Sequence, residues 1–343
     1  LPLTGILYYL WVGMFGVFVV AQFWTFCADV YTDERGKRML PFIAIGATSG
    51  AVAGSWLVDR LVGSGIVSIE SLLLIATVPL FVSIALVHKV EQREVHPAGL
   101  ADEAITGTTP DAAEVPGETS IWSGARLVLV SRFLLLAALV TLFTNWVNTN
   151  GENLLFRVVQ EALATQAREQ GISGERSLLE FVRDGTTAFY GNFFFWVNVV
   201  ALLLQAFVAS RLLKYGGFAA ILLILPVIAL MSYSVMALLP VLAVVKVMKI
   251  AENATDYSLN NTSRHVLWLP VSSAMRFRGK PAIDTLYVRL GDGLAALTVL
   301  IGVQLLALAT ATFFAFNVLL VLCWLVAAVM LVKEHRRSTE AAV

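Results

Sequence analysis

Apolar residues occur along this chain in long runs separated by short polar segments. A helix needs about 20 residues to cross the hydrocarbon core of a bilayer, and about nine runs are long enough. These runs occupy residues 3–28, 40–62, 67–88, 126–148, 187–212, 217–238, 240–258, 283–308 and 311–333. Because lipid offers the backbone no hydrogen-bond partner, each run is predicted to be a helix. The pattern predicts an all-α membrane protein with about nine transmembrane helices.

The composition agrees with this prediction and excludes several classes of function. Hydrophobic residues make up 58% of the chain and charged residues 14%, which is unlike a soluble domain. The net charge is zero and basic residues are spread along the chain, so nucleic acid is not an expected partner. Cys27 and Cys323 fall in apolar runs, which favours buried thiols over a disulfide or metal site. Phosphate-loop and metalloprotease motifs are absent, so we expect neither a cofactor nor an enzyme.

The basic residues indicate how the chain is oriented. If nine spans alternate, the connections rich in lysine and arginine share one face of the membrane with the C-terminal tail. Cytoplasmic segments carry the excess of these residues, so the C-terminus is predicted to be cytoplasmic. Residues 149–186 then form a long connection on the opposite face.

The spacing of the runs also predicts a division into two halves. Residues 96–120 are rich in Pro, Gly, Thr and Ala and are typical of a flexible linker; three runs precede them and six follow. Transporters are commonly built from two repeated six-helix halves, so three helices would be missing at the front. We therefore assign residues 1–88 to an N-terminal half, 89–125 to a cytoplasmic linker, 126–333 to a C-terminal six-helix half and 334–343 to a cytoplasmic tail. A genuine nine-span protein is the alternative.

Three glycines of the second run share one helix face. Gly46, Gly50 and Gly54 are spaced four residues apart, a pattern that lets two helix backbones approach closely. The spacing predicts helix packing. A sliding contact between the two halves during transport is the functional alternative.

Polar residues around position 250 form a stripe that a lipid-facing helix would not tolerate. A charged side chain at mid-bilayer costs roughly 2.5–3.5 kcal/mol, so a set of them requires a cavity or partners. Helical spacing places five candidate substrate-binding residues along one side: Lys246, Lys249, Glu252, Asn253 and Asp256. Asn260 continues the same stripe. In the alternative, the helix ends near Ala251 and residues 252–264 form a solvated loop.

Two further polar groups are candidates, the first for substrate binding and the second for an outer vestibule. Asp284, Arg289 and Asp292 lie within a few turns of one another, and Arg289 and Asp292 are spaced so that they could neutralise each other. Asn145 and Glu152 lie near the outer end of the fourth run, where they could line a vestibule or cap the helix.

Three sequence segments resemble a known family of transporters. "KIAENATDYSLNNTSRHVLWLP" followed by "RGKPAIDTLYVRLGDGLAAL" resembles the signature region of nucleotide transporters of the ATP/ADP translocase type, found in plastids and intracellular bacteria, and of their free-living bacterial relatives. "AQFWTFCADVYTDERGKRMLPFIAIGATSGAVAGSW" resembles the fourth and fifth helices of that family. The resemblance implies a fold like that of the major facilitator superfamily and exchange of ATP for ADP. Asn260, Asn261 and Asp292 differ from the nucleotide-exchanging members, which carry an aromatic and acidic turn at the first two positions and a lysine at the third.

The resulting functional expectation is a secondary active transporter in the inner membrane of a bacterium. It would be a monomer that exchanges nucleotides or a related anionic, phosphorylated metabolite by alternating access. Lys246 and Lys249 would attract the anionic group, while Asp256 and Glu252 would set their charge state. Asp284, Arg289 and Asp292 would line the opposite wall or form a gate. A facilitator-type carrier of another solute, proton-coupled or not, and a sensor or scaffold that has lost transport are the alternatives.

Overall fold

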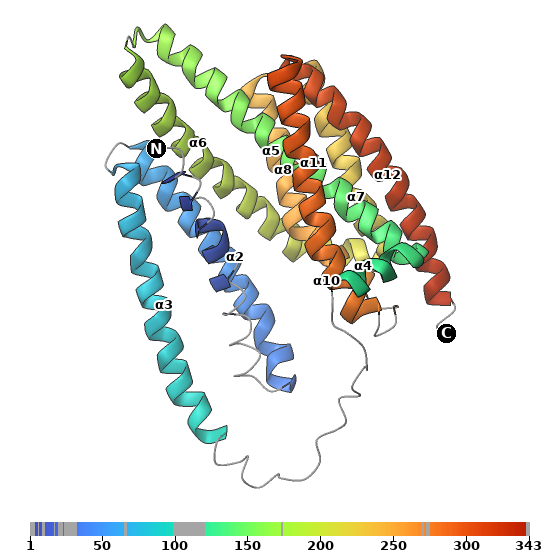
Figure 1. Ribbon diagram of the computed structural model, residues 1–343. Helices are drawn as coiled ribbons and strands as arrows, with labels where there is room; N and C mark the ends of the chain where they lie inside the picture. The colour runs from blue at the N-terminus through green and yellow to red at the C-terminus, as the bar shows by residue number, and fades with distance from the viewer. Residues whose placement is uncertain are drawn as a thin grey trace. The chain divides into compact units, whose positions relative to one another are not determined.

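The chain folds into helices. The computed structural model describes residues 33–64, 67–98, 121–172, 174–268, 271 and 275–340, with scattered positions before residue 24. Within these residues no strand occurs, which confirms the all-α class. The α-helices, many of which Figure 1 labels, are α2 (Asp33–Gly63), α3 (Ile69–Ala98), α4 (Ile121–Val130), α5 (Arg132–Glu169), α6 (Glu175–Leu203), α7 (Ser210–Leu238), α8 (Leu242–Thr255), α9 (Asn261–Leu267), α10 (Lys280–Ala282), α11 (Val288–Val299) and α12 (Thr310–Glu340). Wider π-helical turns join several of them: η2 (Leu204–Ala209), η3 (Asp256–Asn260), η4 (Met275–Gly279), η5 (Ile283–Tyr287) and η6 (Leu300–Leu305).

Four of the described helical segments are long and apolar enough to cross a membrane. They are Arg132–Glu169, Glu175–Leu238, Lys280–Gly302 and Thr310–Arg337, and a shorter apolar helix covers Leu74–Val90. The segment Glu175–Leu238 comprises α6, η2 and α7 and contains two predicted runs, 187–212 and 217–238. The run 240–258 lies on α8, which has only 14 residues before η3. An all-helical membrane protein is therefore supported, whereas nine transmembrane helices stay a prediction.

One exposed face of α12 is apolar, as contact with lipid requires. On α12, the exposed residues Leu319, Leu322 and Val326 follow helical spacing along one side. Cys323 lies on the same side as an exposed free thiol. The expectation that Cys323 is buried is therefore wrong, since an apolar run in a membrane helix can face lipid as well as protein. Cys27 lies outside the described residues.

The helix containing the fourth run differs from its predicted limits at both ends. Ser131 has an extended backbone and its side chain accepts from the Leu134 N–H, so α4 ends and α5 begins there. The helix then continues to Glu169 for 38 residues, about 57 Å, roughly twice the thickness of the hydrocarbon core. An ion pair of 2.8 Å between Arg157 and Glu161 supports this extension. Much of the predicted connection 149–186 is therefore helical.

A glycine separates the two predicted runs that lie within Glu175–Leu238. Gly217 has φ 64° and ψ −166°, a conformation that side chains other than glycine rarely adopt. It divides α7 into a short first part and the stretch 218–238. The predicted boundary between the runs 187–212 and 217–238 falls at this break.

The chain divides into two compact units. One comprises residues 1–51 and 67–115 and the other comprises residues 52–66 and 116–343, so α4 to α12 all belong to the second. Residues 99–120, most of the predicted linker, lie outside the described residues. The limits assigned to the two halves, the linker and the tail remain predictions.

Among the described residues of the second unit, α5 is central to one large core, and Ala209, Ile221 and Leu259 form a small second cluster. Helix α12 packs against α5 and α7, α11 packs against α5, and α8 contacts α5, α6 and α7. The contact between α11 and α5 depends on Gly291, because a Cβ there would lie 2.8 Å from the Leu142 carbonyl oxygen. This packing brings one face of α8 against the middle of α5.

The predicted glycine stripe has no close neighbour in the described structure. Gly46, Gly50 and Gly54 are exposed, and no described atom would lie within 4 Å of a Cβ at any of them. Their role in helix packing stays a prediction.

Candidate functional site

The polar stretch after position 248 is helical and buried. Helix α8 continues to Thr255 and is followed directly by η3 and α9. Lys249 is 0% exposed, and Glu252 and Asn253 are each 3% exposed. The alternative in which the helix ends near Ala251 and a solvated loop follows is therefore wrong. Within η3, Ser258, Leu259 and Asn260 are buried, whereas Tyr257 is exposed.

Lys249 lies between two carboxylates. Its Nζ is 3.1 Å from Glu252 Oε2, one turn along α8, and 3.3 Å from Glu152 Oε1 on α5. The Nζ also donates to Asn148 Oδ1 at 3.5 Å. Asn148 and Glu152 are four residues apart, so both project from the same side of α5. Two carboxylates and one ammonium give this group a formal charge of −1.

The two carboxylates differ in their surroundings. The Glu252 side chain is 4% exposed, and its Oε1 accepts from the Tyr233 hydroxyl at 3.0 Å. The Glu152 side chain is 34% exposed, and its Oε1 accepts from Asn253 Nδ2 at 2.8 Å. Glu252 is therefore held inside the bundle, whereas Glu152 lies at the edge of the buried group.

A glycine makes room for this arrangement. A Cβ on Gly151 would lie 2.0 Å from the Tyr233 hydroxyl and 2.8 Å from Lys249 Nζ. Without a side chain at position 151, both groups can approach the backbone of α5. The Tyr233 hydroxyl is also within 3.2 Å of the Val147 carbonyl oxygen.

A second polar contact adjoins the first and reaches α12. Asn150 Nδ2 donates to Asn317 Oδ1 at 3.1 Å, and Asn317 Nδ2 donates to the Val147 carbonyl at 3.4 Å. Both asparagines are buried. Because Tyr233 and Asn317 share the Val147 carbonyl, polar contacts run from α8 through α7 and α5 to α12.

Two other residues of the predicted stripe have their own partners. Lys246 donates to Asn192 Oδ1 on α6 at 2.6 Å and lies 5.4 Å from the centre of the Phe189 ring. Asp256 Oδ1 accepts from Asn260 Nδ2 at 2.6 Å, across η3. The carboxylates that contact Lys249 are Glu252 and Glu152, so Asp256 is not in direct contact with either lysine of the stripe.

The charged residues before and within α11 are paired outside the Lys249 group. Asp284 forms an ion pair of 2.6 Å with Lys280. Arg289 and Asp292 form the expected pair at 3.2 Å, and Asp292 also accepts from Thr149 of α5 at 2.9 Å. These pairs are largely exposed. Their proposed role as a wall or gate stays a prediction.

Asn145 and Glu152, the two candidate vestibule residues, differ in their contacts. Asn145 Nδ2 donates to the Thr141 carbonyl of its own helix at 2.8 Å. Glu152 instead contacts α8 directly. Sequence spacing alone could not show which of the two residues contacts another helix, because the partner of Glu152 lies about 100 residues further along the chain.

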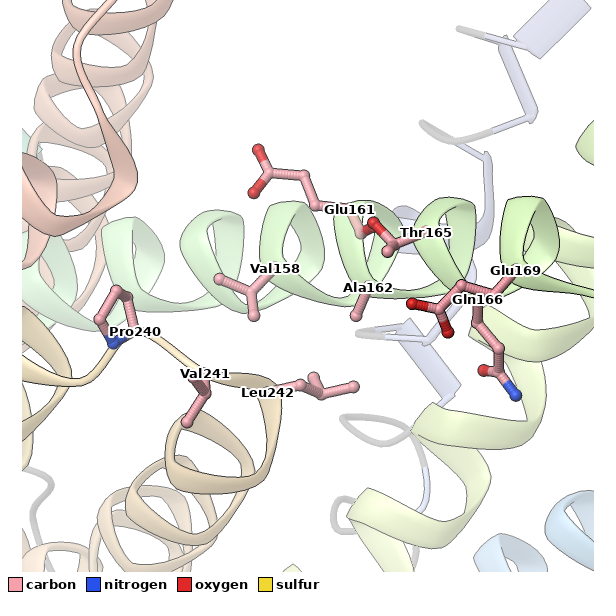
Figure 2. Close-up of a pocket in the computed structure, with 9 residues that line it drawn as sticks. All are labelled: Val158, Glu161, Ala162, Thr165, Gln166, Glu169, Pro240, Val241 and Leu242. Carbon is pink, nitrogen blue, oxygen red and sulfur yellow. The ribbon is translucent and has the colours of Figure 1, made fainter.

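A groove on the second unit lies away from the Lys249 group. Figure 2 shows it between the C-terminal part of α5 and the turn that joins α7 to α8. Its volume is about 400 Å³, and its polar lining includes Glu161, Thr165 and Glu169. Among the described residues, no three His, Cys, Asp or Glu side chains are placed to hold a metal ion.

Sequence reasoning did not identify Tyr233, Gly151, Asn192 or Asn317 as part of this region. Asn192 and Asn317 are polar residues inside predicted spans, which was the one signal that could have found them. Tyr233 and Gly151 gave no such signal, since both are ordinary in membrane helices.

Comparison with known proteins confirms the resemblance to nucleotide transporters over part of the chain. Residues 229–335 match the family model described as TLC ATP/ADP transporter. The ADP,ATP carrier protein 1 of Chlamydia pneumoniae is 28% identical over 129 residues, which is 32% of this chain and 25% of that protein. The protein of the same name from Chlamydia trachomatis is 26% identical over 125 residues, 31% of this chain and 24% of that protein. The matches thus span about a quarter of these relatives, and no solved structure matches the chain.

The matched region contains Lys249 and most of the polar residues that contact one another around it. Tyr233, Lys249, Glu252 and Asn317 lie within it, whereas Glu152 precedes it. The matched family model is described as one of transporters, which agrees with the prediction that this chain is not an enzyme.

Proposed function

We propose that this chain is part of a secondary active transporter that exchanges nucleotides of the ATP/ADP type, or a related phosphorylated metabolite. The observation that carries the proposal is Lys249, a buried cation on α8 inside the region that matches the ATP/ADP transporter family. A buried ammonium flanked by polar side chains is a suitable partner for an anionic group. The names of the Chlamydia relatives supply the substrate class.

Lys249 has to become accessible for this function. It is 0% exposed where α8 packs against α5, so an anionic substrate can reach it only if these helices separate. Alternating access of two halves around a central site would supply that movement. We accordingly propose a major-facilitator-like bundle in which residues 126–333 form the C-terminal half.

The proposed placement is the inner membrane of a bacterium, with the C-terminus in the cytoplasm and the protein acting as a monomer. The short connections rich in lysine and arginine support this orientation. We propose that the substrate path is bordered by Lys246, Asp284, Arg289 and Asp292. Asn253 and Asp256 would support α8 and η3.

Proton-coupled transport of another solute is the second candidate. Its support is the formal charge of −1 on Lys249, Glu252 and Glu152, because a net negative group suits a proton or a cation better than a polyanion. Asp292, where the resemblance leads one to expect a lysine, agrees with this candidate.

Transport by the full-length protein in proteoliposomes separates the two functions. Exchange predicts that labelled ATP enters only vesicles preloaded with ADP or ATP, whether or not a pH gradient is present. Proton coupling predicts that the transported solute enters vesicles without any preloaded nucleotide, and that its uptake rises with an inward proton gradient. Absence of nucleotide uptake under both conditions, in protein that binds and carries another solute, would contradict the first proposal.

A further inference from the structure

The two carboxylates on Lys249 are not equivalent, and the difference bears on how an anionic substrate would gain access to the lysine. An ammonium that already contacts two carboxylates has little capacity for a third anion. A substrate group must therefore replace one of them. The structure indicates which carboxylate can leave.

Glu252 is held in place on several sides. Its two oxygens are occupied by Lys249 Nζ at 3.1 Å and by the Tyr233 hydroxyl at 3.0 Å. Only 4% of the side chain is exposed, and it shares a helix with Lys249. Moving this carboxylate away from the lysine would leave an unpaired charge inside the bundle, which is strongly unfavourable.

Glu152 can leave at a much lower cost. A third of its side chain is exposed, its distance to Lys249 Nζ is 3.3 Å, and it lies on α5 rather than on α8. A carboxylate at such an edge can turn toward water and keep its charge solvated. Any separation of α5 from α8 would also lengthen this contact, while the contact between Lys249 and Glu252 would stay intact.

We infer that Glu152 is a displaceable counter-ion: it occupies Lys249 in the empty carrier and yields it to the anionic group of the substrate. This inference rests on the proposed function and adds a specific role to it. Asn253 has a matching part, since its Nδ2 donates to Glu152 at 2.8 Å and orients the carboxylate toward the lysine. Glu152 thus acts through Lys249: it competes with the substrate for the ammonium and does not itself bind the substrate.

The test compares apparent KM values for exchange of labelled ATP by the full-length protein in ADP-loaded proteoliposomes. Glu152→Gln keeps the shape of the side chain and an acceptor for Asn253 but removes the charge that competes with substrate. We expect its KM to fall about two- to fivefold, which corresponds to the interaction free energy of a partly exposed ion pair. Glu161→Gln is the matched control, because Glu161 lies on the same helix and pairs with Arg157. Its KM should equal that of the wild type.

A second variant guards against misfolding of the first. Glu152→Asp keeps the charge but shortens its reach toward Lys249, so its KM should also fall, by less than for Glu152→Gln. A KM that is unchanged or raised in Glu152→Gln would overturn the inference. Failure of both variants to insert would overturn it too, since a displaceable contact is not required for folding.

One further variant separates this inference from the proposed function. Lys249→Gln should lose exchange or raise KM strongly, whatever the role of Glu152. Wild-type kinetics for Lys249→Gln would refute the role of the lysine itself. Impaired exchange in Lys249→Gln together with an unchanged KM in Glu152→Gln would refute only the displaceable counter-ion.

Discussion

Lys249 and Glu252 form an ion pair of 3.1 Å within one turn of α8, with side chains that are 0% and 4% exposed. Buried pairs of this kind contribute little net stability, but removing one partner leaves the other without compensation. The pair therefore constrains substitutions at both positions.

Lys249→Gln should abolish nucleotide uptake and destabilise the protein by about 3–5 kcal/mol, because Glu252 loses its counter-charge inside the bundle. Lys249→Arg should retain part of the activity, since the charge persists in a side chain of different shape. The double variant Lys249→Gln with Glu252→Gln should lose less stability than the sum of the single variants. Uptake at matched expression and thermal unfolding in detergent measure these effects. An additive double variant would indicate that the two residues are not coupled.

Glu252→Gln and Asp256→Asn should differ, although the sequence places both carboxylates on the same stripe. Asp256→Asn keeps the oxygen that accepts from Asn260, so we expect a change in stability within about 1 kcal/mol. Glu252→Gln removes the closest charge to Lys249 and should cost about 3 kcal/mol or more. Thermal unfolding of the two purified variants tests the order. A more damaging Asp256→Asn would contradict it.

Gly151→Ala should disturb the site more than the addition of one methyl group would suggest. The added Cβ would collide with the Tyr233 hydroxyl and crowd Lys249, at a cost of about 1–3 kcal/mol from overpacking. Gly293→Ala on α11 is the matched control, because no described atom would lie within 4 Å of its Cβ. Unfolding and uptake should both change in the first variant and stay close to the wild type in the second. Equal behaviour of the two would argue against close packing at Gly151.

Single cysteines should report the orientation of the chain. In a background with Cys27 and Cys323 replaced, cysteines at Ser338 and Thr109 should resist an impermeant thiol reagent in intact cells. A cysteine at Ser173 should be labelled, because the connection that contains it is predicted to lie outside. Permeabilised cells provide the control for reactivity. Labelling at Thr109 from outside would reverse the proposed orientation.

The sequence by itself determined that this is an all-helical membrane protein and that polar residues near position 250 need a protein environment. Both conclusions follow from local physical chemistry: lipid requires internal hydrogen bonds, and a buried charge requires a partner. The resemblance to nucleotide transporters also came from contiguous segments, and the comparison over residues 229–335 confirms it.

Only the tertiary structure decided which partners the buried charges have. Helical spacing grouped Glu252 with Asp256 on one stripe. The second carboxylate that contacts Lys249 instead comes from Glu152 on α5, and α6 and α7 lie between α5 and α8 in the chain. Tyr233 and Gly151 enter the site for the same reason, since the packing of α5, α7 and α8 brings them together. The pattern along one helix shows that a face is buried, but the residues opposite that face depend on how separate helices pack.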